Sequence, residues 1–218
     1  MNDLGELRYF LGIELARSSE GILLSQRKYA LEMISNTGLS GSKPKWTPME
    51  KNLKLTSSEH DLKFSTKSDD VPLEDRSIYQ RLVGKLLYVT ITRPDISYVA
   101  QSLSQFMHAP KKSHYEVALH VVKYIKSQPG LGLLISRKGD EKIVAYCDSD
   151  WASCPMSRRS VSGFCVKLGI SLISWKSKKQ NTISRSSAKA EYRCMAQTIA
   201  ELTWLKGLLQ EVQLPIDL

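Results

Sequence analysis

The sequence predicts a chain of the α+β class, in which a mainly helical half precedes a half made of a three-stranded antiparallel meander and a helix. Apolar residues between 77 and 125 recur at every third or fourth position, which is typical of helices that pack on one face. Between 131 and 175, short apolar runs are instead separated by glycine and polar turns, which is typical of strands. We therefore expect two domains, over residues 1–130 and 131–218.

The first domain is expected to begin with a β-hairpin. The apolar runs RYFLGIELA at 8–16 and GILLS at 21–25 are joined by a short polar turn. A helix should follow, because apolar residues recur at helical spacing between Ser25, a candidate cap, and Gly38, which is well placed to end it. The polar stretch from about 40 to 76 is then expected to be a long exposed connection.

Three helices are predicted next, and they are expected to pack as a small bundle. The first covers about 77–90 and the second about 96–107, where Asp95 after a proline is a candidate cap. The third starts near Ser113 and should stop at the Pro-Gly pair at 129–130.

The second domain is expected to be a meander followed by a helix. Its predicted strands cover about 132–135, 142–147, 161–168 and 171–175. The last three are so closely spaced that adjacent strands should run antiparallel. From Ser186 onward, apolar residues return to a spacing of three or four, which predicts a helix that includes Glu191.

The positive charge of the chain is concentrated in one stretch. The 218 residues carry 31 Lys and Arg against 22 Asp and Glu, a formal net charge of +9. Residues 151–190, called here the acid-free block, contain no Asp or Glu. This arrangement favours a polyanion such as nucleic acid as partner, whereas the plainer interpretation is a mildly basic soluble protein. The basic residues of the block are Arg158, Arg159, Lys167, Lys176, Lys178, Lys179, Arg185 and Lys189.

The cysteines and histidines do not form a recognisable metal site. None of the four cysteines stands in a Cys-x-x-Cys pair, and the four histidines lack the spacing of metal ligands. The pattern favours reduced thiols in an intracellular protein, with no choice between cytoplasm and nucleus. No apolar run reaches about 18 residues and the N-terminus is unlike a secretory signal, so no membrane partner is expected.

Three carboxylates are candidates for chemistry. Asp148 and Asp150 follow the apolar run of the predicted strand 142–147, and Glu191 lies about one turn into the helix that should pack on the sheet. Acids from a strand end and a helix can together hold Mg²⁺, and two such ions can activate water for phosphodiester cleavage. Paired acids are also a common way to end a strand at a turn, and most helix glutamates are solvated.

Several blocks of the sequence resemble the Pol polyproteins of copia-type long-terminal-repeat retrotransposons. CDSDWAS, RRSVSGFCVKLG and ISWKSKKQNTISRSSAKAEYRCMA resemble their ribonuclease H region. MNDLGELRYFLGIEL and YQRLVGKLLYVTITRPDISYVAQSLSQFMHAP resemble the end of the reverse transcriptase and its connection to ribonuclease H. The resemblance covers nearly the whole chain, with the blocks in the same order.

The resemblance implies a connection- or thumb-like first half and an incomplete RNase-H-like second half. It assigns Asp148 and Glu191 as the first and second acids of a Mg²⁺ site, whereas Asp150 belongs to the same block without being an obligatory ligand. An RNA–DNA hybrid or another nucleic acid is the implied partner. The residues expected to contact it, from their charge, are Arg158, Arg159, Lys176, Lys178, Lys179 and Arg185.

The chain also departs from the pattern that it resembles. It contains no Tyr-x-Asp-Asp polymerase block, so DNA synthesis is not expected. It contains no Cys-Asp-Asn block, which carries the third ribonuclease H acid in the resembled family, and Asp217 is not expected to replace it. Lys189 stands where members of that family commonly carry an acid, and a surface substitution is the favoured explanation.

Two functions follow from these observations. The first is a truncated retrotransposon polyprotein fragment that is catalytically inactive alone and at most binds nucleic acid. The alternative is a Mg²⁺-dependent ribonuclease H that cleaves the RNA strand of RNA–DNA hybrids.

Overall fold

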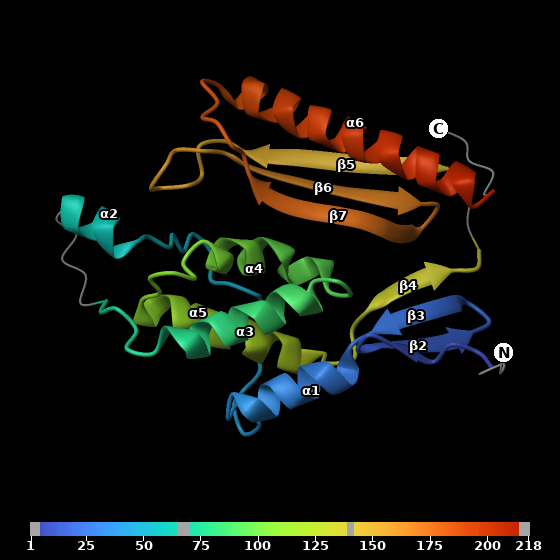
Figure 1. The fold of residues 1–218 in the computed structure, drawn as a ribbon, viewed down its shortest axis with the longest axis horizontal. Helices are drawn as coiled ribbons and strands as arrows, with labels where there is room; N and C mark the ends of the chain where they lie inside the picture. The colour runs from blue at the N-terminus through green and yellow to red at the C-terminus, as the bar shows by residue number, and fades with distance from the viewer. Residues whose placement is uncertain (1–4, 65–69, 139–141, 214–218) are drawn as a thin grey trace. The chain divides into compact units, whose positions relative to one another are not determined.

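The computed structural model describes residues 5–64, 70–138 and 142–213, and it confirms the α+β class (Figure 1). The chain divides into two compact units. One comprises Met1–Ala16 and Leu23–Leu133, and the other comprises Arg17–Ile22 and Leu134–Leu218. The division runs through a four-stranded sheet, because a short N-terminal segment belongs with the second unit.

The four-stranded sheet contains the predicted hairpin. Its strands are β1 (Tyr9–Phe10), β2 (Ile13–Ser18), β3 (Gly21–Ser25) and β4 (Leu133–Ser136), in the order β1-β2-β3-β4. Gly21 opens β3 with a φ of +144°, and a side chain at this position would collide with the backbone oxygen of Ile135. Glycine is therefore required where these two strands approach each other.

The helices of the first unit bury one apolar core. They are α1 (Arg27–Asn36), α2 (Ser58–Lys63), α3 (Arg76–Val89), the 3-10 helix η1 (Pro94–Ile96), α4 (Ser97–Ser104) and α5 (Lys112–Ser127). The predicted spacing of apolar residues is confirmed, since Tyr79, Leu86, Val99, Val121 and Ile125 are almost completely buried. A core of this kind supplies the main favourable free energy of folding.

Two predicted helix caps are wrong. Ser25 lies within β3, and the residue that precedes α1 is Gln26, whose side chain makes no capping hydrogen bond. Asp95 lies inside η1 and binds the buried Arg93 guanidinium, with 2.7 Å between Nη2 and Oδ2, while the Tyr124 hydroxyl donates to the same oxygen. This acid neutralises a buried cation instead of capping α4.

The connection is mostly exposed over its described residues, 40–64 and 70–76, as predicted, but it contains the short helix α2 and much of it is tied to α5. The Lys126 ammonium donates to three backbone carbonyls of one short segment, those of residues 39, 40 and 42. The Lys45 amide donates to the Lys123 carbonyl at 3.1 Å. Sequence periodicity could not detect these bonds, because the connection uses its backbone and not an apolar face.

The second unit has the predicted meander and helix. Strands β5 (Ile143–Asp150), β6 (Val161–Leu168) and β7 (Ser171–Lys179) pair antiparallel in the order β5-β6-β7. Helix α6 (Ser187–Glu211) lies along one face of this sheet (Figure 1). Ile143, Phe164, Val166 and Leu205 form the buried core between them. The hydroxyl of Ser186 caps α6 by accepting from the Lys189 amide.

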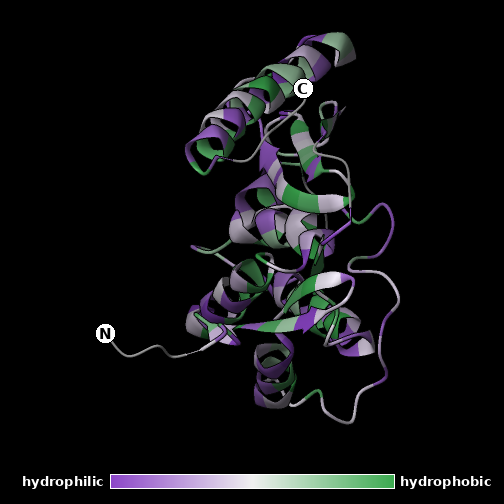
Figure 2. Cartoon of the chain, turned by 90° about the vertical axis from the view of Figure 1, so that its right-hand side faces the viewer, coloured by the Kyte–Doolittle hydropathy of each residue, from purple (hydrophilic) through white to green (hydrophobic). Residues whose placement is uncertain are grey.

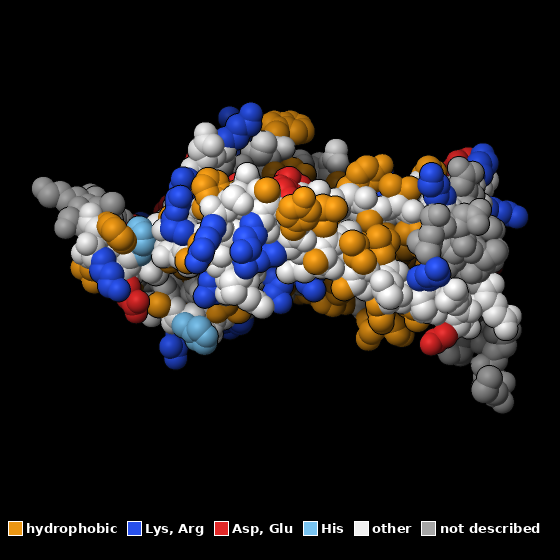
Figure 3. Space-filling model, turned by 90° about the horizontal axis from the view of Figure 1, so that it is seen from above, with side chains coloured by type: hydrophobic (Ala, Val, Ile, Leu, Met, Phe, Trp, Pro, Cys, Tyr) orange, Lys and Arg blue, Asp and Glu red, His pale blue; other side chains and the backbone are white. Residues whose placement is uncertain are grey.

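Helix α6 also exposes apolar residues on its outer side. Hydrophobic residues recur along the whole helix (Figure 2), and a view onto it shows apolar side chains at the surface between groups of Lys and Arg (Figure 3). The large apolar side chains exposed on α6 are Tyr192, Met195, Ile199, Trp204 and Leu208, and the exposed Val212 follows at its C-terminal cap. In the described part of the chain, no helix combines the length and the apolar character that a membrane crossing requires.

Candidate metal and nucleic-acid site

The structure brings Glu191 to the strand that carries Asp148. Glu191 lies one turn after the cap of α6, and its Oε1 accepts a hydrogen bond from the Ser149 amide at 3.2 Å. The strand β5 extends through Asp150, so both predicted acids lie inside the strand and not in the turn after it. The fold therefore places Glu191 against Ser149, the residue that follows Asp148 in β5.

The strand register places Asp148 and Glu191 on different sides of the sheet. Side chains alternate along a strand, and Ser149 faces α6, because its hydroxyl accepts from Gln180, which also bonds the backbone of α6. Asp148 therefore faces the opposite side, where it pairs with Gly163 on β6. The two carboxylates can meet only around the outer edge of β5, which has no further strand beside it among the described residues.

A buried polar network fixes the distance between β5 and α6. The Gln180 Nε2 lies 2.8 Å from the Ser162 hydroxyl, 3.0 Å from the Ala190 carbonyl and 3.2 Å from the Ser149 hydroxyl. Its Oε1 accepts from the Ser184 hydroxyl at 3.0 Å. Because buried polar groups are costly unless they are paired, this network specifies one arrangement of the strand and the helix.

A second tie joins the end of β5 to the segment before α6. The Trp151 indole donates to the Ser184 carbonyl at 2.9 Å, and the Arg193 guanidinium donates to the Ser184 hydroxyl at 3.0 Å. Both bonds hold the segment that leads into α6 beside the acids of β5. Trp151, which immediately follows the Asp-x-Asp pair, therefore has a structural role at the site.

The donor set at this edge is small. Asp148 is exposed and Glu191 is half-buried, so their carboxylate oxygens are the type of ligand that Mg²⁺ prefers. Within residues 5–64, 70–138 and 142–213, no group of three or more His, Cys, Asp and Glu side chains could hold a metal ion. Asp217 lies outside the described residues. Lys189 is exposed on the first turn of α6, which agrees with the favoured explanation of a surface substitution.

The predicted nucleic-acid residues lie on three different segments. Arg158 is exposed and Arg159 half-buried in the loop between β5 and β6, and Arg185 is exposed just before α6. Lys176 and Lys178 are exposed on β7, opposite Phe164 and Ser162, and therefore lie on the α6 side of the sheet. Lys179 is half-buried, with its ammonium 3.8 Å from the Cys154 sulfur.

The register identifies residues on the face of Asp148 that sequence analysis did not relate to it. Tyr146, Lys167 and Trp175 share the face of Asp148, because Tyr146 pairs with Cys165 and Cys165 with Trp175. The Lys167 ammonium lies 5.9 Å from the centre of the exposed Tyr146 ring. The alternation of side chains along the predicted strands could have grouped these residues, but only with the register known.

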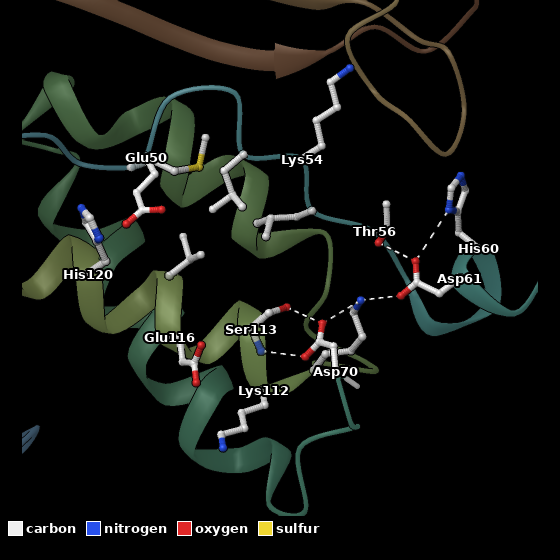
Figure 4. Close-up of a pocket in the computed structure, with 15 residues that line it drawn as sticks. Glu50, Lys54, Thr56, His60, Asp61, Asp70, Lys112, Ser113, Glu116 and His120 are labelled. Atoms are coloured by element: carbon white, nitrogen blue, oxygen red, sulfur yellow. Dashed lines mark hydrogen bonds and ion pairs between the residues drawn. The ribbon is translucent and has the colours of Figure 1, made fainter. Parts of the chain in front are cut away.

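A cavity in the first unit is a separate candidate site. Its volume is about 760 Å³, and it lies between α5 and the connection over residues 49–61 (Figure 4). At one end, the buried Lys111 ammonium binds Asp61 at 2.6 Å and Asp70 at 2.8 Å. Ser113 also donates to Asp70, at 2.6 Å from its hydroxyl. No periodic pattern in the sequence brings these charges together, so sequence analysis missed the cluster.

The charges of this cluster are paired with one another. Burial acts to raise the pKa of the Asp61 and Asp70 carboxyls, but hydrogen bonds from Lys111 outweigh it, and both pKa values lie below the usual range. Burial acts to lower the pKa of Lys111, and its bonds to Asp61 and Asp70 raise that pKa instead. The three groups are therefore ionised and paired, and we assign them a structural role.

Comparisons with known proteins identify the class of the chain. It is 43% identical to the uncharacterized mitochondrial protein AtMg00810 of Arabidopsis thaliana over 94% of this chain and 80% of that protein. It is 40% identical to the retrovirus-related Pol polyprotein from transposon RE2 of the same plant, over 97% of this chain and 14% of the polyprotein. The corresponding polyprotein from transposon TNT 1-94 of Nicotiana tabacum is 31% identical over 98% of this chain and 16% of its own length.

These relatives place the chain among homologues of retrotransposon Pol polyproteins. It belongs to the Pol-related family that includes AtMg00810. It corresponds to about one seventh of the RE2 polyprotein's length. No family model matches the chain, and no solved structure matches it.

Proposed function

We propose that the chain corresponds to the end of the reverse transcriptase and part of the ribonuclease H region of a copia-type Pol polyprotein. Its activity is to bind nucleic acid through the acid-free block, without cutting it when the chain is alone. The observation that carries the proposal is that Arg158, Lys176, Lys178 and Arg185 are exposed on a unit whose Asp148 and Glu191 lie on different sides of the sheet.

The site supports binding better than cleavage. Two carboxylates that approach one strand edge from opposite faces can hold a magnesium ion loosely, and Glu191 already shares one oxygen with the Ser149 amide. Cleavage by two metal ions needs a clamp on both the attacking and the leaving oxygen, and therefore more oxygen ligands than these two residues supply. The basic side chains need no metal to attract phosphate groups.

The alternative function is a Mg²⁺-dependent ribonuclease H acting on the RNA strand of RNA–DNA hybrids. The hydrogen bond of Glu191 to the amide of Ser149, the residue next to Asp148, is the observation that favours it. We expect the 218-residue chain with Mg²⁺ to cleave a labelled RNA–DNA hybrid no faster than the Asp148→Asn and Glu191→Gln variants do. Magnesium-dependent cutting by the wild-type chain that disappears in both variants would establish the alternative function instead.

Binding is expected to be sensitive to salt and independent of Asp148. Charge reversal of the exposed Lys176 and Lys178 together should lower the affinity for a hybrid duplex, because each lysine neutralises phosphate. The slope of log affinity against log salt should become less steep by about 0.9 for each phosphate contact removed. Fluorescence anisotropy of a labelled hybrid at several salt concentrations measures both quantities.

The controls reverse single lysines elsewhere in the second unit and are compared with the single reversals of Lys176 and Lys178. Lys206→Glu reverses an exposed lysine on α6 outside the acid-free block and should leave the slope unchanged. Lys167→Glu tests the face that carries Asp148. Binding that survives reversal of Lys176 and Lys178 but is lost with Lys167→Glu would move the interface to the opposite side of the sheet.

A further inference from the structure

Trp46 is exposed in a segment that holds it in a defined place. Trp46 is 81% exposed to solvent, whereas tryptophan side chains in folded proteins are usually more than half buried. The residue lies in the connection that packs beside α5, between Pro44 and Pro48. It is far in sequence from the acid-free block and was not part of the proposed interface.

Hydrogen bonds fix the backbone on both sides of Trp46. The preceding residue, Lys45, donates its amide to the Lys123 carbonyl at 3.1 Å. The following residue, Thr47, accepts at its carbonyl from the Nε2 of His120, 2.9 Å away. The two flanking prolines further restrict the backbone torsions. The indole is therefore presented by a tethered segment, and ordering it on binding costs little conformational entropy.

The surroundings of the indole are positively charged. No Asp or Glu occurs between Leu39 and Met49, while Lys43 and Lys45 are exposed on either side of Pro44. Lys123, half-buried on α5, contributes a third positive charge to the same region. A partner that fits an exposed aromatic ring among lysines has a flat aromatic group beside negative charge. An unpaired nucleobase with its phosphates has this chemistry.

We propose that Trp46 stacks on an unpaired base of single-stranded nucleic acid, with Lys43 and Lys45 contacting the adjacent phosphates. This contact extends the proposed function, on which it rests, to a second surface and a second form of nucleic acid. A base within a duplex is stacked on its neighbours, so Trp46 distinguishes single strands from duplexes.

The test measures binding of a labelled single-stranded oligothymidine and of a labelled hybrid duplex to the 218-residue chain and its variants. Trp46→Leu should weaken binding of the single strand by about 5- to 150-fold, the range that the loss of one stacked base produces. Binding of the duplex should stay within about twofold. Trp204→Leu is the matched control, because Trp204 is 60% exposed on α6 and should affect neither ligand.

The outcomes separate this inference from the proposed function. Single-strand binding that is unaffected by Trp46→Leu overturns the stacking contact, even if the duplex still binds through Lys176 and Lys178. An effect of Trp46→Leu on the single strand together with no effect of the Lys176 and Lys178 reversals supports the stacking contact and removes the proposed interface. If the wild-type chain binds neither ligand, both fail. If Trp46→Leu abolishes self-association of the chain and not nucleic-acid binding, the partner is a second copy and the inference is wrong.

Discussion

Replacing Lys111 by methionine is expected to lower the free energy of unfolding by about 3–5 kcal/mol, the usual cost of removing one partner from a buried ion pair. The side chain of Lys111 is almost completely buried, and its ammonium binds both Asp61 and Asp70, whose carboxylates are labelled in Figure 4. Methionine preserves most of the side-chain volume but leaves two carboxylates close together without a cation. Urea unfolding followed by circular dichroism measures the loss.

Two companion variants separate charge from packing. Lys112→Met changes the adjacent exposed lysine and should alter stability by less than about 0.5 kcal/mol. Adding Asp61→Asn and Asp70→Asn to Lys111→Met removes the unpaired negative charges and should restore much of the lost stability. A loss of less than about 1 kcal/mol in Lys111→Met alone would contradict the claim that pairing of Lys111 with Asp61 and Asp70 stabilises the folded protein.

The unfolding free energy is expected to fall by up to about 3 kcal/mol as the pH drops from about 6.5 to about 4, because of His114. Burial, assisted by the Lys111 ammonium, lowers the pKa of this imidazole to about 4. The unfolded chain therefore takes up the proton first, at its ordinary pKa of 6.5, and protonation draws the equilibrium toward unfolding. The contribution of neutral His114 to the unfolding free energy is fully present above about pH 6.5 and is lost as the pH falls toward 4.

The geometry explains why the folded state holds His114 neutral. Its Nδ1 accepts from the Lys111 amide at 3.1 Å, and its Nε2 donates to the Thr56 carbonyl at 3.1 Å. A proton on Nδ1 would break the first bond, and the stacked Phe106 ring, 3.9 Å away, offers no replacement acceptor. The charged groups that face the ring are Lys111, Asp61 and Asp70, and both carboxyls have pKa values lowered from 3.8, below this pH window.

Unfolding curves at several pH values, compared between variants, test this assignment. His114→Asn should flatten the dependence between pH 6.5 and 4, because the new side chain carries no titrating proton. His108→Asn changes an exposed histidine and should leave the dependence as it is. An unchanged slope in His114→Asn would assign the acid sensitivity to other groups.

The sequence predicted the order of helices and strands well, because the spacing of apolar residues shows which face of each segment is buried. The spacing of Tyr79, Leu82 and Leu86 predicted α3, and the turn at Gly169 separated β6 from β7. Strand β5 ends at Asp150, three residues later than predicted, because its last residues are polar and do not continue the apolar run. Asp150 pairs with Val161 and is still part of the ladder.

The candidate site was predicted only in part, because chain order does not show which face of a sheet a side chain is on. The order of strand and helix predicted that Asp148 and Glu191 come close, but only the register shows that the Asp148 side chain leaves the opposite face. Gln180 was missed, because a single amide inside a polar segment has no periodic pattern. The pairing of Lys111 with Asp61 and Asp70 depends on chain segments about fifty and forty residues away, which local patterns do not relate.

The Gln180 network has a practical consequence for measurements on this protein. Its members are an amide, three serine hydroxyls and a backbone carbonyl, and none of them carries a net charge. Added electrolyte weakens contacts between ammonium groups and phosphate, but it hardly affects bonds between neutral groups that are shielded from solvent. The distance between β5 and α6 should therefore persist at ionic strengths that dissociate a bound oligonucleotide. A loss of oligonucleotide signal under those conditions then reports displacement by counterions and not melting of the protein.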